Sequence, residues 1–181
     1  FSSRKHVLEY DDVMNKQRQA VYGMRRALLE GQDMRERVLD ITRSIVQTYL
    51  DKNCPDNEHP TKWDTTAFQS DVLTQFGVKV DLETITGMTR QEIEDWTYDL
   101  LLKRYEEKER LISPDLLRET ERLVMLNVID NQWKDHLLSM DHLKEGIGLR
   151  GYGQKDPLVE YKKESFHLFQ DMMDRIEDET I

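Results

Sequence analysis

Cysteine is almost absent from this 181-residue sequence, in which Cys54 is the single example. One cysteine excludes a disulfide within the chain and a zinc site built on several cysteines. The sequence has no run of 18 apolar residues either, so it predicts no membrane-spanning helix. Aromatic residues make up only 8% of the chain, and there are four prolines. This composition favours long packed helices over a thick globular core.

Positive charge is also in short supply. The 26 Lys and Arg residues are outnumbered by 36 Asp and Glu residues, which leaves a formal net charge of −10. Because phosphate binding needs a basic face, this balance disfavours the chain as a nucleic-acid binder. The acidic balance names no other partner, since it mainly affects solubility.

Nucleotide-binding motifs are missing as well. Gly146, Gly148 and Gly151 match the spacing G-x-G-x-x-G, but a helical pattern precedes them where a dinucleotide site needs a strand. The chain contains no Gly-Lys-Ser/Thr sequence of the kind that ends a phosphate-binding loop. Nucleotide binding by this segment is therefore not predicted.

Three groups of polar residues have a chemical interpretation and a simpler structural one. Acidic residues near the N-terminus suit a helix start better than a metal site, because adjacent helical residues point about 100° apart. A Cys and a His in one loop supply too few ligands for zinc. A third group on a long helix has no paired nucleophile, so it predicts a solvated face. The groups are Glu9, Asp11 and Asp12; Cys54 and His59; and Asp135, His136, Asp141 and His142.

A seven-residue apolar repeat marks the first part of the chain as amphipathic helix. Asp33–Glu36 has the form of a capping box just after Gly31, yet the apolar stripe continues across that glycine. One helix over about 4–52 and two helices separated near Gly31 fit this pattern equally well. The repeat consists of Val7, Met14, Val21 and Leu28, followed by Met34, Val38, Ile41, Ile45 and Tyr49.

The middle of the chain predicts a small helical module. Residues 53–64 contain two prolines and several turn formers, which indicates a loop and a module boundary. A short helix is expected from Asp64 to Gly77. Thr89–Glu92 is another capping box, and it starts a helix expected to reach about Leu111.

The last part of the chain predicts two helices joined by a glycine-rich connection. Ser113 and Pro114 form a helix start, with proline at the first helical position. Asp156 and Pro157 start the second helix. The connection expected over 146–157 holds four of the eight glycines. Two helices joined in this way pack antiparallel.

This connection is longer than a helix–helix turn needs. It carries Tyr152 between two glycines, with Arg150 and Lys155 nearby in an otherwise acidic chain. A tyrosine ring makes adaptable contacts at low entropic cost, because only two torsions must be fixed. A plain turn is the simpler alternative, but these residue types favour contact with another polypeptide.

Five segments resemble the SecA family of bacterial preprotein translocase motors. Arg4–Arg18 is similar to the start of that family's helical scaffold. Residues 55–115 match only in position and helical character, and would correspond to its helical wing. The segments similar to its two-helix finger are Glu121–Leu126, Trp133–Leu137, Leu149–Pro157 and Glu160–Phe166.

The resemblance implies an all-α fold with a long scaffold helix, a small helical wing module and an antiparallel two-helix finger. The implied boundaries are 1–54 for the long scaffold helix, 55–113 for the wing and 114–181 for the finger, with its tip at 146–157. The chain would then be one part of a longer protein.

The resemblance also implies a function, that of a non-catalytic part of a protein translocase. This part would couple ATP-driven motion of motor domains to preprotein movement through the SecYEG channel, while the segment 141–153 restrains ATP hydrolysis. ATP, magnesium and zinc would bind elsewhere in the longer protein, so the chain alone would be inactive. The implied location is the bacterial cytoplasm and the cytoplasmic face of the inner membrane, as a peripheral protein on an anionic surface.

The residues implied to contact the preprotein and the channel lie at the tip of the finger. They are Leu149, Arg150, Tyr152, Gln154 and Lys155, and the tip would be shaped by Gly148, Gly151 and Gly153.

Two functions of other classes remain as alternatives. The seven-residue repeat would allow a freestanding helical adaptor to bind a partner helix along its apolar stripe. The acidic residues Glu9, Asp11 and Asp12 would allow a carboxylate metalloenzyme if a second element supplied further ligands.

Overall fold

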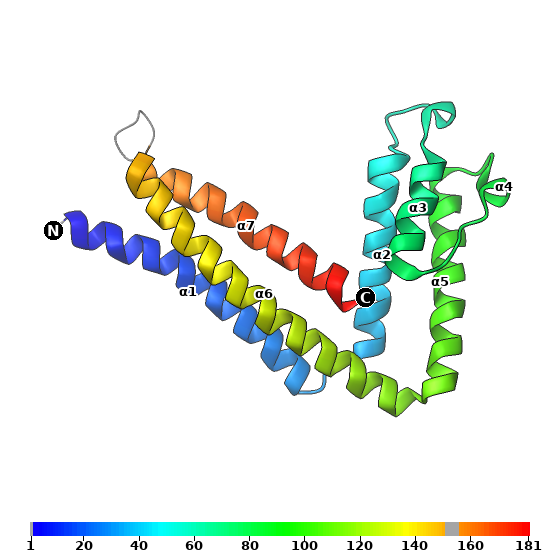
Figure 1. Ribbon diagram of the computed structural model, residues 1–181, viewed down its shortest axis with the longest axis horizontal. Coiled ribbons are helices and arrows are strands. Elements are labelled where there is room, and N and C mark those ends of the chain that lie inside the picture. The colour runs from blue at the N-terminus through cyan, green and yellow to red at the C-terminus, as the bar shows by residue number, and fades with distance from the viewer. Residues whose placement is uncertain (1, 151–155) are drawn as a thin grey trace. The chain divides into compact units, whose positions relative to one another are not determined.

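The computed structural model describes residues 2–150 and 156–181, and the described residues form helices and no β-strand (Figure 1). The all-α class predicted from the sequence is confirmed. The helices in chain order are α1 (Ser2–Leu29), α2 (Met34–Asn53), the 3₁₀ turn η1 (Pro60–Lys62), α3 (Thr65–Phe76), α4 (Leu82–Ile85), α5 (Arg90–Ile112), α6 (Pro114–Arg150) and α7 (Pro157–Thr180).

Internal contacts divide the chain into two compact units. The hairpin unit comprises the described residues within 1–32 and 122–180, and thus α1, most of α6 and α7. The wing unit comprises 33–121, and thus α2 to α5 with the first turns of α6. Within the wing unit α2 packs against both α3 and α5. The family boundaries implied at 54/55 and 113/114 stay a prediction.

The helix is interrupted between α1 and α2, so the alternative of two helices separated near Gly31 is correct. Gly31 adopts φ +100°, a backbone conformation that glycine accepts without a Cβ clash. The Gln32 amide donates to the Ala27 carbonyl at 3.0 Å, which closes the end of α1. The carboxylate of Asp33 then accepts from the amides of Arg35 and Glu36, which confirms Asp33 as the N-cap of α2.

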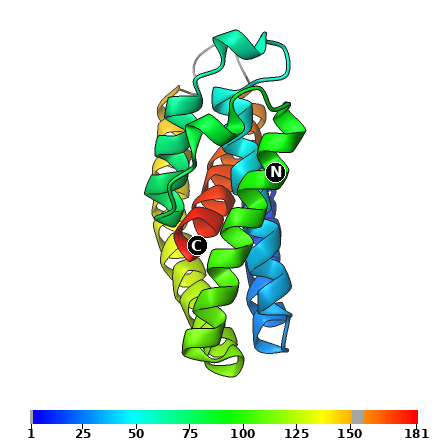
Figure 2. The same ribbon diagram turned by 90° about the vertical axis from the view of Figure 1, so that its right-hand side faces the viewer.

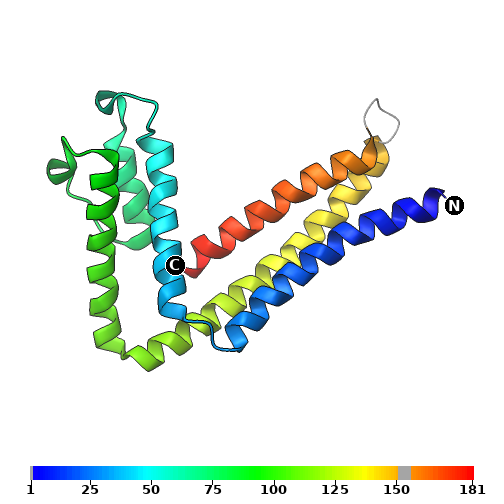
Figure 3. The ribbon, with the colours of Figure 1, turned by 180° about the vertical axis from the view of Figure 1, so that it is seen from behind.

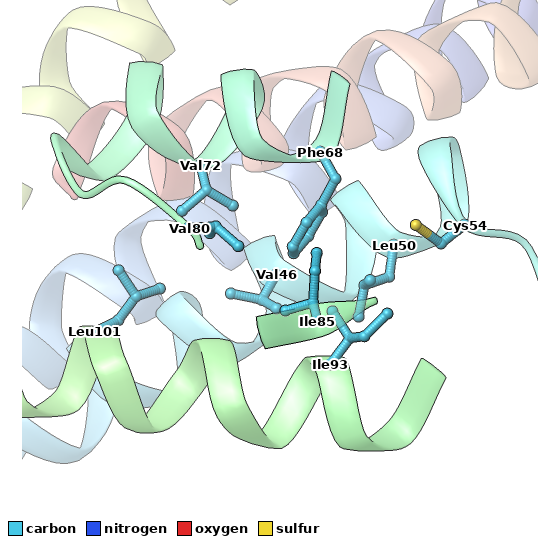
Figure 4. Close-up of a cluster of buried hydrophobic side chains, with 9 residues drawn as sticks. All are labelled: Val46, Leu50, Cys54, Phe68, Val72, Val80, Ile85, Ile93 and Leu101. Carbon is cyan, nitrogen blue, oxygen red and sulfur yellow. The ribbon is translucent and has the colours of Figure 1, made fainter. Parts of the chain in front are cut away.

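The wing unit has its own apolar core, drawn in Figure 4, where side chains of α2, α3 and α5 converge. Two views also place α5 alongside α2 (Figures 1 and 2). The predicted cap at Thr89 is confirmed, since its side chain accepts from the Glu92 amide at 3.2 Å. Gly77 ends α3 as expected, with φ +68°. The core residues are Val46, Leu50, Cys54, Phe68, Val72, Val80, Ile85, Ile93 and Leu101.

A sharp bend at Ser113 joins α5 to α6. Ser113 has φ +95°, and its hydroxyl accepts weakly from the Leu116 amide at 3.4 Å. Just beyond the bend, Arg118 of α6 donates to Glu109 of α5 at 2.7 Å and lies 2.9 Å from Glu121. Tyr105 donates to the same Glu121 carboxylate. This ionic group ties the first turns of α6 to α5 inside the wing unit.

Candidate functional site

The candidate site is the pair of helices α6 and α7, together with α1, on which they pack. Figures 1 and 3 draw α7 along α6, and the contacts of His136 with Phe169 and of Gln132 with Arg175 place the two helices side by side. Both helices bury one stripe of mostly apolar residues, because positions at helical spacing lie on the same face. The stripe of α6 in this unit is Met125, Ile129, Trp133, His136, Met140, Leu143 and Ile147, and that of α7 is Tyr161, Ser165, Met172 and Ile176.

An apolar cluster joins the three helices where α7 begins. Met140 of α6 and Tyr161 of α7 are each 1% exposed. The ring of Tyr10 from α1 meets the Tyr161 ring edge-on, with 4.7 Å between their centroids. Burial raises the pKa of the Tyr161 phenol to about 12, so this group stays protonated at any physiological pH. The other members of the cluster are Leu143, Ile147, Val13, Met14 and Leu168.

A polar contact crosses the core next to this cluster. The Gln17 side-chain amide donates from Nε2 to the carbonyl of Ser165 at 3.3 Å. Its Oε1 is therefore the acceptor for Nε2–H of His136, at 2.7 Å. Gln17 is 8% exposed and His136 is 1% exposed. One residue of α1 thus bonds to both α6 and α7, and we call this contact the Gln17–His136 tie.

The His136 ring is held between aromatic side chains. It stacks on Trp133 at 5.6 Å between centroids and meets Phe169 of α7 edge-on at 5.7 Å. Burial, together with the nearby charge of Arg175, lowers the pKa of His136 to about 4. The imidazole is therefore neutral near pH 7.

The prediction of a solvated face for His136 was wrong, whereas Asp135, Asp141 and His142 are exposed as expected. The physical reason is position: His136 follows Ile129 and Trp133 at the spacing of the buried stripe. This spacing could have indicated that His136 is buried, but its polar side chain favoured the assignment to a solvated face.

Polar contacts nearer the surface also join these helices. Gln132 of α6 accepts from Arg175 of α7 at 2.8 Å and donates to Glu179 at 2.9 Å. Arg25 of α1 forms two hydrogen bonds to the carboxylate of Asp130, at 2.9 and 3.3 Å. The pairings run antiparallel between α1 and α6 and again between α6 and α7. The predicted two-helix hairpin geometry is thus present in this unit.

The glycine-rich connection begins later than the sequence predicts. Gly146 and Gly148 lie inside α6, which continues to Arg150, so the expected loop over 146–157 was wrong at its start. The reason is that Leu143 and Ile147 keep the buried stripe going, and this packing outweighs the cost of about 1 kcal/mol per helical glycine. The helical conformation also removes Gly146 and Gly148 from any G-x-G-x-x-G loop.

The predicted contact residues are placed only in part. Leu149 is 85% exposed on the last turn of α6, and Gly148 has open space where a Cβ would project. The side chain of Arg150 lies outside the described part of the structure. So do Gly151, Tyr152, Gly153, Gln154 and Lys155, whose assigned roles stay predictions.

The other polar groups from the sequence are not brought together. Asp12 pairs with Lys16 one turn along α1 at 3.2 Å, and Asp11 is exposed. Cys54 is buried in the wing core, which raises the pKa of its thiol. His59 instead accepts from the Thr61 amide at the start of η1. Among residues 2–150 and 156–181, no three His, Cys, Asp or Glu side chains converge as metal ligands.

The stripe proposed for a helical adaptor is largely covered by the chain itself. Val21 is 2% exposed and Leu28 is fully buried, while Met14 packs against the cluster around Tyr161. Only Val7 of the first four repeat positions is exposed, at 52%. The partner of this stripe is therefore within the chain. None of the described helices is both long enough and apolar enough to cross a membrane.

Comparison with known proteins matches this arrangement to one family. The sequence model described as "SecA Wing and Scaffold domain" matches residues 1–181, the whole chain. The chain belongs to the SecA wing and scaffold family. This membership confirms the resemblance found in the sequence.

Relatives named "Protein translocase subunit SecA" agree with this membership. The chain is 59% identical over 181 residues to the one from Solibacter usitatus and 52% identical over 184 residues to the one from Koribacter versatilis. It is 47% identical to the one from Acidobacterium capsulatum. All of this chain is covered in each case, but only 19%, 18% and 18% of those proteins. The chain thus spans about a fifth of the length of these relatives.

Proposed function

We propose that this chain is the coupling part of a SecA protein translocase. ATP-driven motion of motor domains in the longer protein moves α1, and the α6–α7 hairpin moves with it. The segment after α6 then contacts a preprotein at the SecYEG channel. The observation that carries the proposal is the packing of both hairpin helices on α1, through the Tyr10–Tyr161 cluster and the Gln17–His136 tie.

Such coupling requires that α1 and the hairpin move together. A helix held only by exposed side chains would slide or roll, because surface contacts contribute little free energy. Here the contact is a buried core with interlocking side chains, which transmits displacement because packed interiors are nearly incompressible. The hairpin is therefore suited to act as a lever on α1.

The polypeptide-contacting end is proposed to be formed by Leu149, Arg150, Tyr152, Gln154 and Lys155. Leu149 supports this assignment, since a side chain 85% exposed at a helix end has no packing role within the described residues. Two cations and one ring suit contact with varied unfolded chains, because such contacts need no fixed sequence. Gly148, Gly151 and Gly153 would give the backbone around them its shape.

Nucleotide chemistry is proposed to lie in the remainder of the longer protein. ATP and magnesium would bind there, and so would zinc, since this chain has one cysteine and no Gly-Lys-Ser/Thr sequence. In the same proposal the segment 141–153 restrains ATP hydrolysis by the motor domains. The whole protein would act as a peripheral protein at the cytoplasmic face of the cell membrane.

The test is the substitution Tyr152→Gly in the full-length protein. We expect preprotein transport into SecYEG vesicles to fall several-fold while basal ATP hydrolysis is unchanged, because the ring is lost but the motor domains are untouched. Tyr152→Phe is the matched control and should transport normally, since it keeps the ring. Normal transport by Tyr152→Gly would refute the assignment of this residue.

A further inference from the structure

Gln17 is a buried side chain of α1 that bonds to both other helices of the hairpin unit. Among the described residues, no other side chain of α1 is shown with hydrogen bonds to both α6 and α7. Gln17 accepts from His136 of α6 and donates to the backbone of Ser165 of α7. The tie lies beside apolar contacts on every helix, including Met14 and Met140. It is therefore a directional contact inside a core whose other contacts are mostly apolar.

Apolar packing alone leaves the axial position of α1 poorly determined. The hydrophobic effect has no direction, so a helix shifted by one turn of about 5.4 Å regains much of its buried area. Such a shift would bring Val13 or Val21 to the level of His136 in place of Gln17. Both are apolar, so the core would still close around them.

The polar groups respond differently to the same shift. A valine offers His136 Nε2–H no acceptor, and the ring is too deeply buried to reach water. An unsatisfied buried donor carries the full desolvation penalty, so the shifted arrangements are disfavoured. In the observed register, by contrast, the tie adds little net stability, because its own desolvation offsets most of the gain. A single buried polar contact sets register in coiled coils by this mechanism.

We propose that Gln17 and His136 set the axial register of α1 against α6 and α7. In the observed register the two side chains pair with each other. In a shifted register the buried His136 donor would have no acceptor, which disfavours that register. This inference concerns the chain itself and does not depend on a role in protein transport.

Two other contacts are competing candidates for the same role. Arg25 and Asp130 also join α1 to α6, but their side chains are 40% and 51% exposed, and exposed pairs contribute little. Gln132 bonds only to α7, so it does not position α1. Each can be removed separately from the tie.

The register can be measured as a distance in the 181-residue chain. Nitroxide labels on Ala27→Cys of α1 and Glu145→Cys of α6, in a Cys54→Ala background, lie at exposed positions. Pulsed electron resonance then reports their separation. Because α1 and α6 are antiparallel, these positions lie toward opposite ends of the helix pair. A one-turn shift of α1 therefore changes the separation by about 5 Å.

The decisive variant combines Gln17→Met with His136→Leu, which keeps the core filled and removes both polar groups. With Gln17 and His136 intact, we expect one narrow distribution of distances between the two labels. In the double variant we expect a second population whose label-to-label distance differs by about 5 Å. The controls Arg25→Gln and Gln132→Met should keep the single distance. The single variant Gln17→Met should unfold at a lower urea concentration than the double variant, because it alone leaves His136 unpaired.

Several outcomes would overturn the proposal. A single unchanged distance in the double variant would mean that apolar packing sets the register. A second distance in Arg25→Gln would assign that role to the surface pair. A double variant that no longer folds, or that is less stable than Gln17→Met, would mean that the tie supplies stability and not register.

Discussion

His136 is a base held neutral in a core. Its ring is 1% exposed and lies between Trp133 and Phe169, with Gln17 as its hydrogen-bond partner. Protonation would place a charge in this apolar site close to Arg175, which is why its pKa is lowered. Any condition that charges His136 therefore acts on the contact between α1 and the hairpin.

This lowered pKa predicts how stability depends on pH. The pKa of His136 is 6.5 when unperturbed and about 4 in the folded chain, so between these values the unfolded state binds more protons. The contribution of neutral His136 to the free energy of unfolding is therefore complete above about pH 6.5, and it is lost as the pH falls toward 4. We expect the free energy of unfolding to drop by about 2 kcal/mol between pH 7 and pH 5 from this group.

Urea unfolding at the two pH values measures the drop. His136→Gln is the comparison, because it keeps a polar amide but cannot titrate, and it should remove this part of the pH dependence. Equal pH dependence in both proteins would mean that His136 does not remain neutral in the fold.

At the scale of elements, several helix starts were predictable from the sequence, whereas the end of α6 was not. The caps at Asp33, Thr89 and Asp64 follow from local chemistry, since each carboxylate or hydroxyl bonds to amides within three residues. Whether Gly31 breaks the first helix was undecided, because its neighbours fit either backbone path. Tertiary packing also decides how far α6 runs: Ile147 is 3% exposed, and its burial extends the helix through Gly146 and Gly148.

The same limit applied to the candidate site. The antiparallel hairpin could be predicted, because it needs only two amphipathic helices and a connection between them. The Gln17–His136 tie could not, because its partners are 119 residues apart and the helical spacing that indicates a buried position does not identify a hydrogen-bond partner. Sequence patterns report periodicity and caps within a few residues, whereas pairing of distant polar groups depends on the packed structure.

The helical state of Gly148 makes a prediction for α6. Gly148 is exposed and has open space around a built Cβ, so Gly148→Ala should raise the free energy of unfolding by up to about 1 kcal/mol. Gly77→Ala is the opposite control, because φ +68° is strained for alanine, and it should cost roughly 1–2 kcal/mol. Urea unfolding followed by circular dichroism compares the two. A loss of stability in Gly148→Ala would mean that the connection starts at Gly146 after all.

At the scale of the whole molecule, the two compact units have separate cores. Ile147 belongs to the core of the hairpin unit, with Met140 and Tyr161, and Ile85 belongs to the core of the wing unit. Both isoleucines are almost fully buried, at 3% and 1% exposed. A change of the same chemistry can therefore be made in each unit and its effect on the longer protein compared.

The matched pair Ile147→Val and Ile85→Val tests whether the hairpin restrains ATP hydrolysis. Each removes one buried methylene and should cost about 0.5–1.5 kcal/mol of its own core. In the full-length protein we expect Ile147→Val to raise basal ATP hydrolysis, by up to about fivefold, because 1 kcal/mol of restraint is worth that factor. Ile85→Val should leave the rate unchanged. An unchanged rate of ATP hydrolysis in Ile147→Val would place the restraint outside the segment 141–153. The same increase in both variants would show that a general loss of stability, and not the hairpin, controls the motor.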